Sequence, residues 1–226
     1  MCFSATASFS SGVVLSIIGI TSIRKAPMTS QVPFAAIPFI FAIQQFSEGF
    51  VWLSFTNPGY YGWQPVSSYI FLSFAHVVWP VWVPIAVLLL EKNIKQRNLL
   101  YLLSGCGIVL GYSYAYSLVN YPLSVNIDGH HVQYNLKYPS VLFALTTVFY
   151  GLATIAPAFI STVKRMKWLA IFITISYIAT FILYNEYIIS VWCYFAAVLS
   201  IVIYWIILGL KKDALNFMEI RVKHQS

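Results

Sequence analysis

The sequence contains few charged residues. Only 8% of its 226 residues are Asp, Glu, Lys or Arg, whereas 60% are hydrophobic, and the mean hydropathy is +0.78. A water-soluble domain usually carries about 25% charged residues. This composition therefore excludes a soluble protein. No polar segment is long enough to fold alone, so residues 1–226 are expected to form a single membrane domain.

Cysteine is also scarce. The three cysteines, Cys2, Cys106 and Cys193, are too few and too widely spaced for a disulfide framework or a CxxC metal site. Cys106 and Cys193 are interpreted as apolar packing residues.

Long hydrophobic runs, by contrast, fill most of the chain. Each run is near the roughly 20 residues that a helix needs to cross ~30 Å of hydrocarbon. In lipid a helix satisfies its own backbone hydrogen bonds, whereas an open strand does not. The sequence therefore predicts an all-α bundle of seven transmembrane helices. The predicted spans are residues 6–23, 33–55, 66–90, 99–119, 140–160, 168–184 and 187–210.

Lys and Arg lie almost entirely on one side of these spans. Twelve of the 13 basic residues follow the first, third, fifth or seventh span, and only Lys137 lies on the other side. The positive-inside rule therefore predicts an outside N-terminus and a cytoplasmic C-terminus. No basic residue precedes the first apolar run, so this run is expected to be a retained span and not a cleaved leader. The same basic loops and tail explain the net charge of +7 through contact with anionic lipid, without nucleic-acid binding.

Two ionisable side chains lie within the predicted spans, Glu48 in the second and His76 in the third. Acidic and basic residues cost about 2.5 to 3.5 kcal/mol at mid-helix, so they usually face a cavity and have a partner. At ~1.5 Å per residue, Glu48 and His76 lie about 10 Å and about 15 Å below the outer ends of their spans. These depths allow the two side chains to meet on facing helices.

Other polar residues accompany this pair. Gln44 and Gln45 precede Glu48 by four and three residues, so all three side chains project from one side of their helix. Ser73 precedes His76 by three residues on the next span. These five residues are the predicted ligand-binding set.

Two interpretations of the set remain open. In the first, Glu48 and His76 form a buried pair that only holds two helices together. In the second, which is favoured, Glu48 is a proton acceptor or metal ligand, and His76 is a metal ligand or general acid/base. Pro80 supports the second interpretation, since its missing N–H is expected to leave the His76 carbonyl free for a ligand or water.

The longest outer segment joins the fourth and fifth spans. Residues 125–132 are typical of a β-hairpin with a two-residue Asp-Gly turn. That register pairs Ile127 with His130 and places His130 on the apolar face, over the mouth of the bundle. His130 is thus a candidate lid residue, although an ordinary exposed polar turn has the same composition.

A metal site would need more ligands than Glu48 and His76. A catalytic zinc site has about three protein ligands and an open position for water. On the outer side, His130 and Cys2 are the further candidates. A small residue that enters a helix remains the favoured interpretation of Cys2, because nothing in the sequence shows a reactive thiol.

Three segments resemble a known family. The chain begins Met-Cys-Phe-Ser-Ala-Thr-Ala-Ser-Phe, continues with Gln-Gln-x-x-Glu-Gly-x-x-Trp from Gln44, and has Trp79-Pro80 in the third span. Over most of its length it resembles an uncharacterised family of bacterial integral membrane proteins. The resemblance implies bacterial origin, and hence the cytoplasmic membrane, but no activity.

Three functions are compatible with these observations. The favoured one is a receptor- or transport-like protein that binds a small ligand, a metal ion or a proton in an outer-facing intramembrane cavity. The alternative is a metal-dependent intramembrane hydrolase of lipid-like substrates, with zinc as the candidate cofactor. A non-catalytic subunit that binds other membrane proteins is the third.

Overall fold

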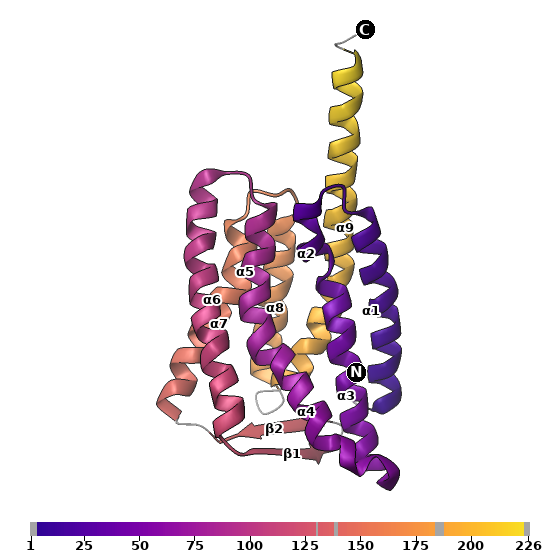
Figure 1. Cartoon of the computed structure of the whole chain (residues 1–226), viewed down its shortest axis with the longest axis vertical. Helices are drawn as coiled ribbons and strands as arrows, with labels where there is room; N and C mark the ends of the chain where they lie inside the picture. Colours follow the sequence, from indigo (N-terminus) through magenta and orange to yellow (C-terminus); the bar gives the residue numbers. More distant parts are fainter. Residues whose placement is uncertain (1–3, 130, 138–139, 184–187, 224–226) are drawn as a thin grey trace.

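The fold was taken from a computed structural model, which describes residues 4–129, 131–137, 140–183 and 188–223 (Figure 1). Within these ranges the side chains of residues 140–145, 188–190, 193–194, 196–197 and 221–223 are not described. Long helices lie side by side in one bundle, a two-stranded sheet crosses one end, and the last helix projects from the other end (Figure 1).

The helices follow the apolar runs of the sequence. They are α1 (Ala5–Lys25), α2 (Val32–Ala35), α3 (Ile37–Thr56), α4 (Gln64–Leu72), α5 (Trp79–Leu90), α6 (Ile94–Asn120), α7 (Ser140–Ile160), α8 (Met166–Leu183) and α9 (Ile188–Lys223). A π-helical segment, Ser73–Val78, joins α4 to α5, and 3₁₀ turns occupy Thr29–Gln31 and Pro58–Trp63. The strands are β1 (Leu123–Asp128) and β2 (His131–Leu136).

Five helical stretches in the described part of the chain are long and apolar enough to cross a membrane. They are Ala5–Lys25, Thr29–Thr56, Pro58–Leu90, Ile94–Asn120 and Met166–Leu183. Thr146–Ile160 is a shorter apolar helix. The predicted span ends at residues 184 and 187 lie outside the described residues. The mostly helical, membrane-compatible fold is therefore confirmed at this coarser level.

Glycines bring the helices close together. A Cβ atom on Gly19 of α1 would lie 2.5 Å from the backbone nitrogen of Phe39 in α3, and a Cβ atom on Gly12 would lie 2.9 Å from the Phe46 ring. Small residues at such contacts let helix backbones approach in lipid. This packing holds α1 alongside α3.

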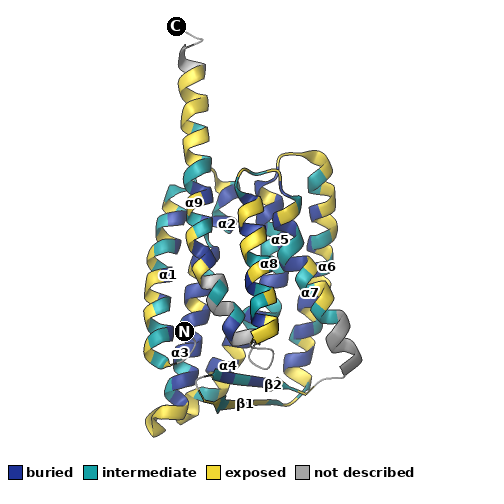
Figure 2. Cartoon of the chain, turned by 180° about the vertical axis from the view of Figure 1, so that it is seen from behind, coloured by how far each residue is buried: buried dark blue, intermediate teal, exposed yellow. Residues whose placement is uncertain are grey.

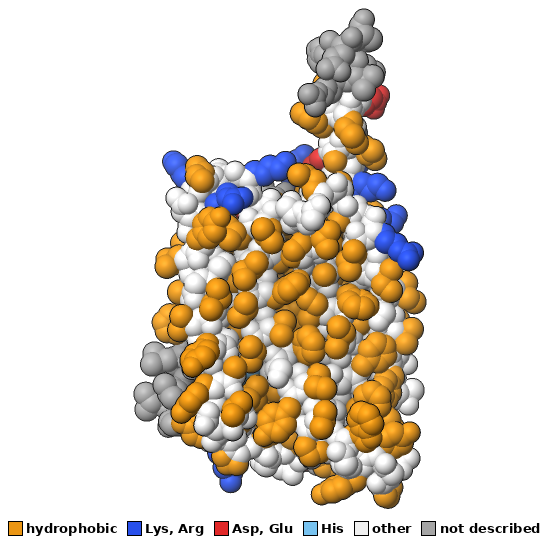
Figure 3. Space-filling view, viewed as in Figure 1, with side chains coloured by type: hydrophobic (Ala, Val, Ile, Leu, Met, Phe, Trp, Pro, Cys, Tyr) orange, Lys and Arg blue, Asp and Glu red, His pale blue; other side chains and the backbone are white. Residues whose placement is uncertain are grey.

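The outer surface of the bundle is apolar. Exposed positions run along the outward faces of the helices, while buried positions face inward (Figure 2). Large hydrophobic side chains such as Ile17, Val109 and Ile182 are 63%, 71% and 70% exposed. An apolar surface of this extent is compatible with a lipid bilayer. On the face shown in Figure 3, most Lys and Arg side chains gather at the end where α9 projects.

The sheet is an antiparallel hairpin whose register differs from the expected one. Ile127 pairs with Val132, and Asp128 pairs with His131. The predicted pairing of Ile127 with His130 is therefore wrong by two residues. The observed register places Ile127 and Val132 directly opposite each other on the face that packs against the bundle. Gly129, with a φ of 57°, begins the turn in the left-handed region that favours glycine.

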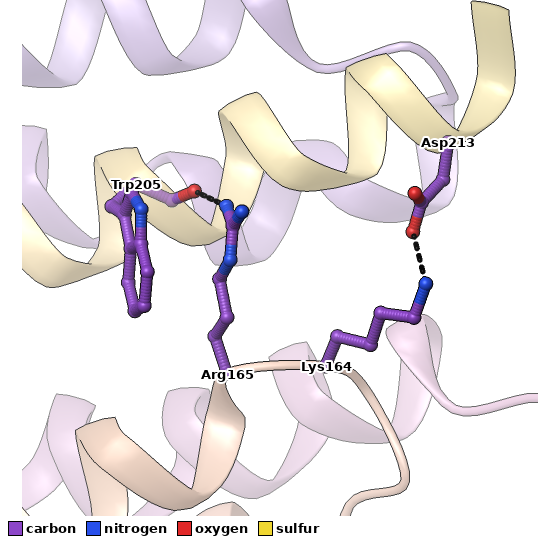
Figure 4. A network of polar contacts seen from close by, with 4 residues as sticks. All are labelled: Lys164, Arg165, Trp205 and Asp213. Atoms are coloured by element: carbon purple, nitrogen blue, oxygen red, sulfur yellow. Dashed lines mark hydrogen bonds and ion pairs between the residues drawn. The ribbon is translucent and has the colours of Figure 1, made fainter. Parts of the chain in front are cut away.

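The link between α7 and α8 holds α9 where it leaves the bundle (Figure 4). The Arg165 guanidinium donates a 2.9 Å hydrogen bond to the Trp205 carbonyl and lies 4.3 Å from the centre of the Trp205 ring. A Cβ atom on Gly209 would lie 2.6 Å from this guanidinium, so a side chain at this position would displace it. Lys164 and Asp213 form a 3.5 Å ion pair, but both side chains are largely exposed, and such pairs stabilise little. Arg165 therefore holds α9 more than the ion pair does, and we call its contacts with Trp205 the clamp.

Candidate functional site

Three polar side chains on α3 are completely buried. Gln44, Gln45 and Glu48 each have 0% exposure. The Gln45 amide nitrogen lies 3.4 Å from the Glu48 carboxylate, to which it donates. The Trp79 indole N–H of α5 donates a 2.7 Å hydrogen bond to the Gln44 side-chain oxygen. We call Gln44, Gln45 and Glu48 the polar stripe.

The polar stripe continues an apolar face of the same helix. Ile37 and Phe41 are buried, and they precede Glu48 by eleven and seven residues, which places them on its side of the helix. The Phe41 ring stacks on Trp79 with centroids 3.9 Å apart. The inner face of α3 thus changes from apolar to polar at Gln44.

His76 lies in the π-helical segment and faces a different neighbour. Its ring packs against Tyr114 of α6, with centroids 4.8 Å apart and an interplanar angle of 53°. The buried Nδ1 atom of His76 has no hydrogen-bond partner in the described structure. In the part of the chain that the structure describes, no ion pair or hydrogen bond joins His76 to Glu48. The two residues therefore belong to different contact groups.

The π-helical register changes the expected effect of Pro80. The backbone N–H of Trp79 donates a hydrogen bond to the Phe74 carbonyl, five residues back. In this register Pro80 would donate to Ala75, so its missing N–H frees the Ala75 carbonyl and not that of His76. The Tyr150 hydroxyl of α7 donates a 2.6 Å hydrogen bond to this Ala75 carbonyl. The π-helical register therefore moves the expected effect of Pro80 to the Ala75 carbonyl, and a free His76 carbonyl stays a prediction.

Tyr150→Phe is expected to lower the free energy of unfolding by about 1 to 2 kcal/mol, since the buried Ala75 carbonyl would lose its donor. Thermal unfolding of purified protein in nanodiscs measures this effect. Tyr112→Phe is the matched control, because Tyr112 is 74% exposed on α6. Equal unfolding temperatures for the two variants would contradict the role given to Tyr150.

Several buried polar atoms on α1, α3 and α4 have no hydrogen-bond partner in the described structure. They include Gln45 Oε1, Ser68 Oγ of α4 and Ser8 Oγ of α1. Phe9, next to Ser8, approaches within 2.9 Å of a Cβ atom placed on Gly49, next to Glu48. Ser8 and Glu48 therefore lie at the same level of the bundle.

The remaining predicted site residues are separate from the polar stripe or outside the description. Half-buried Ser73 lines an open groove between α4 and α6, together with Tyr69, Val77 and Leu118. Cys2 and His130 lie outside the described residues. Among the residues with a described placement, no three His, Cys, Asp or Glu side chains are grouped closely enough to hold a metal ion.

The family of the chain is known from its sequence. Residues 1–215 match the model of a family described as a family of unknown function, DUF6629. The chain belongs to this family. The match includes every helix that carries the polar stripe and His76, and it confirms the expected membership of an uncharacterised family, while bacterial origin stays a prediction. Neither the curated proteins nor the solved structures gave a match.

Sequence reasoning missed a second buried carboxylate within the family region, at the opposite end of the bundle. Glu91 follows α5 and is only 1% exposed. Its carboxylate accepts hydrogen bonds from the Lys92 and Asn93 backbones at 3.0 and 2.9 Å, and from the Thr162 N–H and hydroxyl, both at 2.6 Å. Ser161 Oγ donates a further bond at 3.1 Å.

These hydrogen bonds determine the charge state of Glu91. Burial alone would raise the pKa of the carboxyl, but the hydrogen bonds, the Thr162 hydroxyl foremost, outweigh burial and hold the pKa below its ordinary value of 4.5. Glu91 thus joins two loops as an ionised acceptor. The available sequence signal was that Glu91 is the only acidic residue in the basic loops between predicted spans.

Proposed function

We propose that the chain crosses the bacterial cytoplasmic membrane seven times, with its N-terminus outside and its C-terminus in the cytoplasm. The apolar bundle surface and the basic residues at the end where α9 projects support this topology (Figure 3). Lys137, next to β2, is the basic residue of the opposite end. In this topology the hairpin and the polar stripe belong to the outer half.

We propose that the outer half binds a small ligand, a metal ion or a proton, as a receptor- or transport-like protein does. The complete burial of Gln44, Gln45 and Glu48 carries this proposal, together with the unsatisfied atoms of Gln45, Ser68 and Ser8. A buried polar atom without a partner costs about 1 to 3 kcal/mol. A guest that donates a hydrogen bond to Gln45 Oε1 recovers part of this cost.

The acceptor atoms favour a proton or a small hydrogen-bond donor as the guest. A carboxylate and an amide oxygen accept hydrogen bonds, and membrane carboxylates are the usual carriers of protons in pumps and transporters. A metal-dependent hydrolase would need ligands from outside the described residues, since those described contain no three-ligand group. We therefore place the binding function first.

Glu48→Gln is expected to abolish proton exchange at this site. Infrared difference spectra of the protein in nanodiscs, recorded between two pH values, should contain a carboxyl band that Glu48→Gln lacks. Glu219→Gln is the matched control, because Glu219 is an exposed glutamate of α9. The control should keep the band. Identical spectra for all three proteins would contradict proton binding at Glu48.

Two further measurements distinguish the other guests. Methylammonium, a small donor-bearing cation, should bind the wild type at least tenfold more tightly than Glu48→Gln, as one charge-assisted hydrogen bond requires. Elemental analysis of purified protein tests for a metal. A stoichiometric metal that is lost in both Glu48→Gln and His76→Ala would show that the guest is a metal ion and not a hydrogen-bond donor. Absence of binding in all these assays would leave only the structural role of the polar stripe.

A further inference from the structure

A separate, apolar cavity of about 70 Å³ lies inside the bundle. Side chains of α2, α3, α5, α7, α8 and α9 line it. On α3 its wall is formed by Ile37 and Phe41, on the side of Gln44 away from Glu48. The cavity is therefore distinct from the polar stripe, and the two share only the wall residue Trp79, which bonds Gln44.

The cavity wall contains few polar groups, and nearly all of them are already used. The Trp79 N–H donates to Gln44, and the Tyr150 hydroxyl donates to the Ala75 carbonyl. The Thr154 hydroxyl donates to the Tyr150 carbonyl at 2.8 Å. Among the described wall residues, only the buried indole N–H of Trp192 has no partner.

Neighbouring rings hold the Trp192 indole in place. Tyr150 and Tyr177 contact it edge to face, with centroid distances of 5.7 and 5.4 Å and interplanar angles of 66° and 74°. Such edge-to-face contacts are directional and fix the orientation of an indole ring. The unused N–H therefore belongs to a ring that is held in a fixed orientation in the wall of the cavity.

Water fits this cavity poorly. A volume of about 70 Å³ exceeds the ~30 Å³ that one water occupies in the liquid, but a buried water needs two to four polar partners. One unused N–H supplies a single partner. An apolar cavity of this kind stays dry and binds small apolar molecules.

We propose that this cavity binds a short apolar molecule that carries one hydrogen-bond-accepting oxygen, such as a small ketone. The apolar body contacts Phe41 and Ala158, and the oxygen accepts the Trp192 N–H. The volume is about half of a ~150 Å³ cavity that holds benzene, so about three or four heavy atoms fit. The oxygen is expected to increase affinity about tenfold, which is the usual effect of satisfying one buried donor.

Acetone and isobutene test this proposal, because the two molecules have nearly the same shape and only acetone has an acceptor oxygen. The protein is labelled with ¹⁵N at its indole nitrogens and placed in nanodiscs. The Trp192 N–H resonance is identified as the signal that Trp192→Phe lacks. Acetone should shift this resonance downfield and saturably, and isobutene should bind about tenfold more weakly. The resonance of Trp168, which is 53% exposed on α8, should not move.

Variants that fill the cavity provide the second test. Ala158→Leu should keep the Trp192 resonance but abolish its response to acetone, since Ala158 is a buried wall residue. Val83→Leu fills the cavity from α5 and serves if Ala158→Leu does not fold. Glu48→Gln should respond like the wild type, so failure of the polar-stripe proposal leaves this one intact. An unmoved Trp192 resonance, equal responses to both probes, or a normal acetone response in the filled variants would overturn the proposal.

Discussion

Gly107→Ala is expected to destabilise the bundle by about 3 kcal/mol, at the upper end of overpacking effects. A Cβ atom at this position of α6 would lie 2.0 Å from the Pro80 carbonyl oxygen of α5. The obstacle is backbone, so no side-chain rotation relieves it. The two helices would have to separate. Unfolding in nanodiscs, followed by heat or denaturant, measures the change.

Gly105→Ala is the matched control, two residues away on the same helix. A Cβ atom on Gly105 meets nothing within 4 Å. Alanine is a better helix former than glycine by about 1 kcal/mol, so this variant is expected to be as stable as the wild type or more stable. Equal losses of stability in the two variants would show that α5 and α6 do not pack as described. Tyr114 follows Gly107 by two helical turns, so the His76–Tyr114 contact depends on the same packing.

Glu91→Gln is expected to lower the free energy of unfolding by about 3 kcal/mol at neutral pH. The glutamine keeps the shape of the side chain, but its single NH₂ group turns donors toward either the Thr162 N–H or the Asn93 N–H, which bond different carboxylate oxygens. Charge-assisted hydrogen bonds are also about twice as strong as neutral ones. Glu219→Gln, on the exposed part of α9, should change stability by less than about 0.5 kcal/mol. Similar losses in both variants would contradict the structural role of Glu91.

Glu91 also predicts how stability depends on pH. Its pKa in the folded protein lies below the ordinary value of 4.5, so the folded state favours the ionised form. This contribution is fully present above pH 4.5 and is lost as the pH falls through the lowered pKa. The wild type should therefore lose more stability than Glu91→Gln when the pH is lowered from 4.5. Parallel curves for the two proteins would exclude an ionised Glu91 as the cause.

The sequence predicts the helices well because an apolar segment in lipid has to satisfy its own backbone hydrogen bonds. An apolar run near 20 residues satisfies its backbone only as a helix, so the described parts of the predicted runs are helical, apart from a turn at Ala36 and a π-helical segment at Ser73–Val78. The hairpin register was wrong because Asp-Gly and its neighbours tolerate more than one turn. The pairing of Ile127 with Val132 against the bundle decides between registers, and local sequence does not contain that contact.

The sequence predicted which site residues share one face of a helix, but not which neighbouring helices they contact. Periodicity placed Gln44, Gln45 and Glu48 on one face of α3, because helical spacing is a local property. Which face meets which neighbour depends on how helices rotate about their axes, so the Trp79 and Tyr114 contacts were not predictable. Glu91 was missed for the same reason. It follows the apolar run directly, and its burial depends on Thr162, 71 residues further along the chain.

The clamp at Arg165 contacts α9 part-way along its length. One uninterrupted helix forms the cavity wall at Trp192, passes the Arg165 contact at Trp205, and ends at Lys223. At ~1.5 Å per residue, Trp192 lies about 20 Å on one side of this contact and the tip about 27 Å on the other. A tilt of α9 about this contact would therefore move Trp192 and the projecting tip in opposite directions.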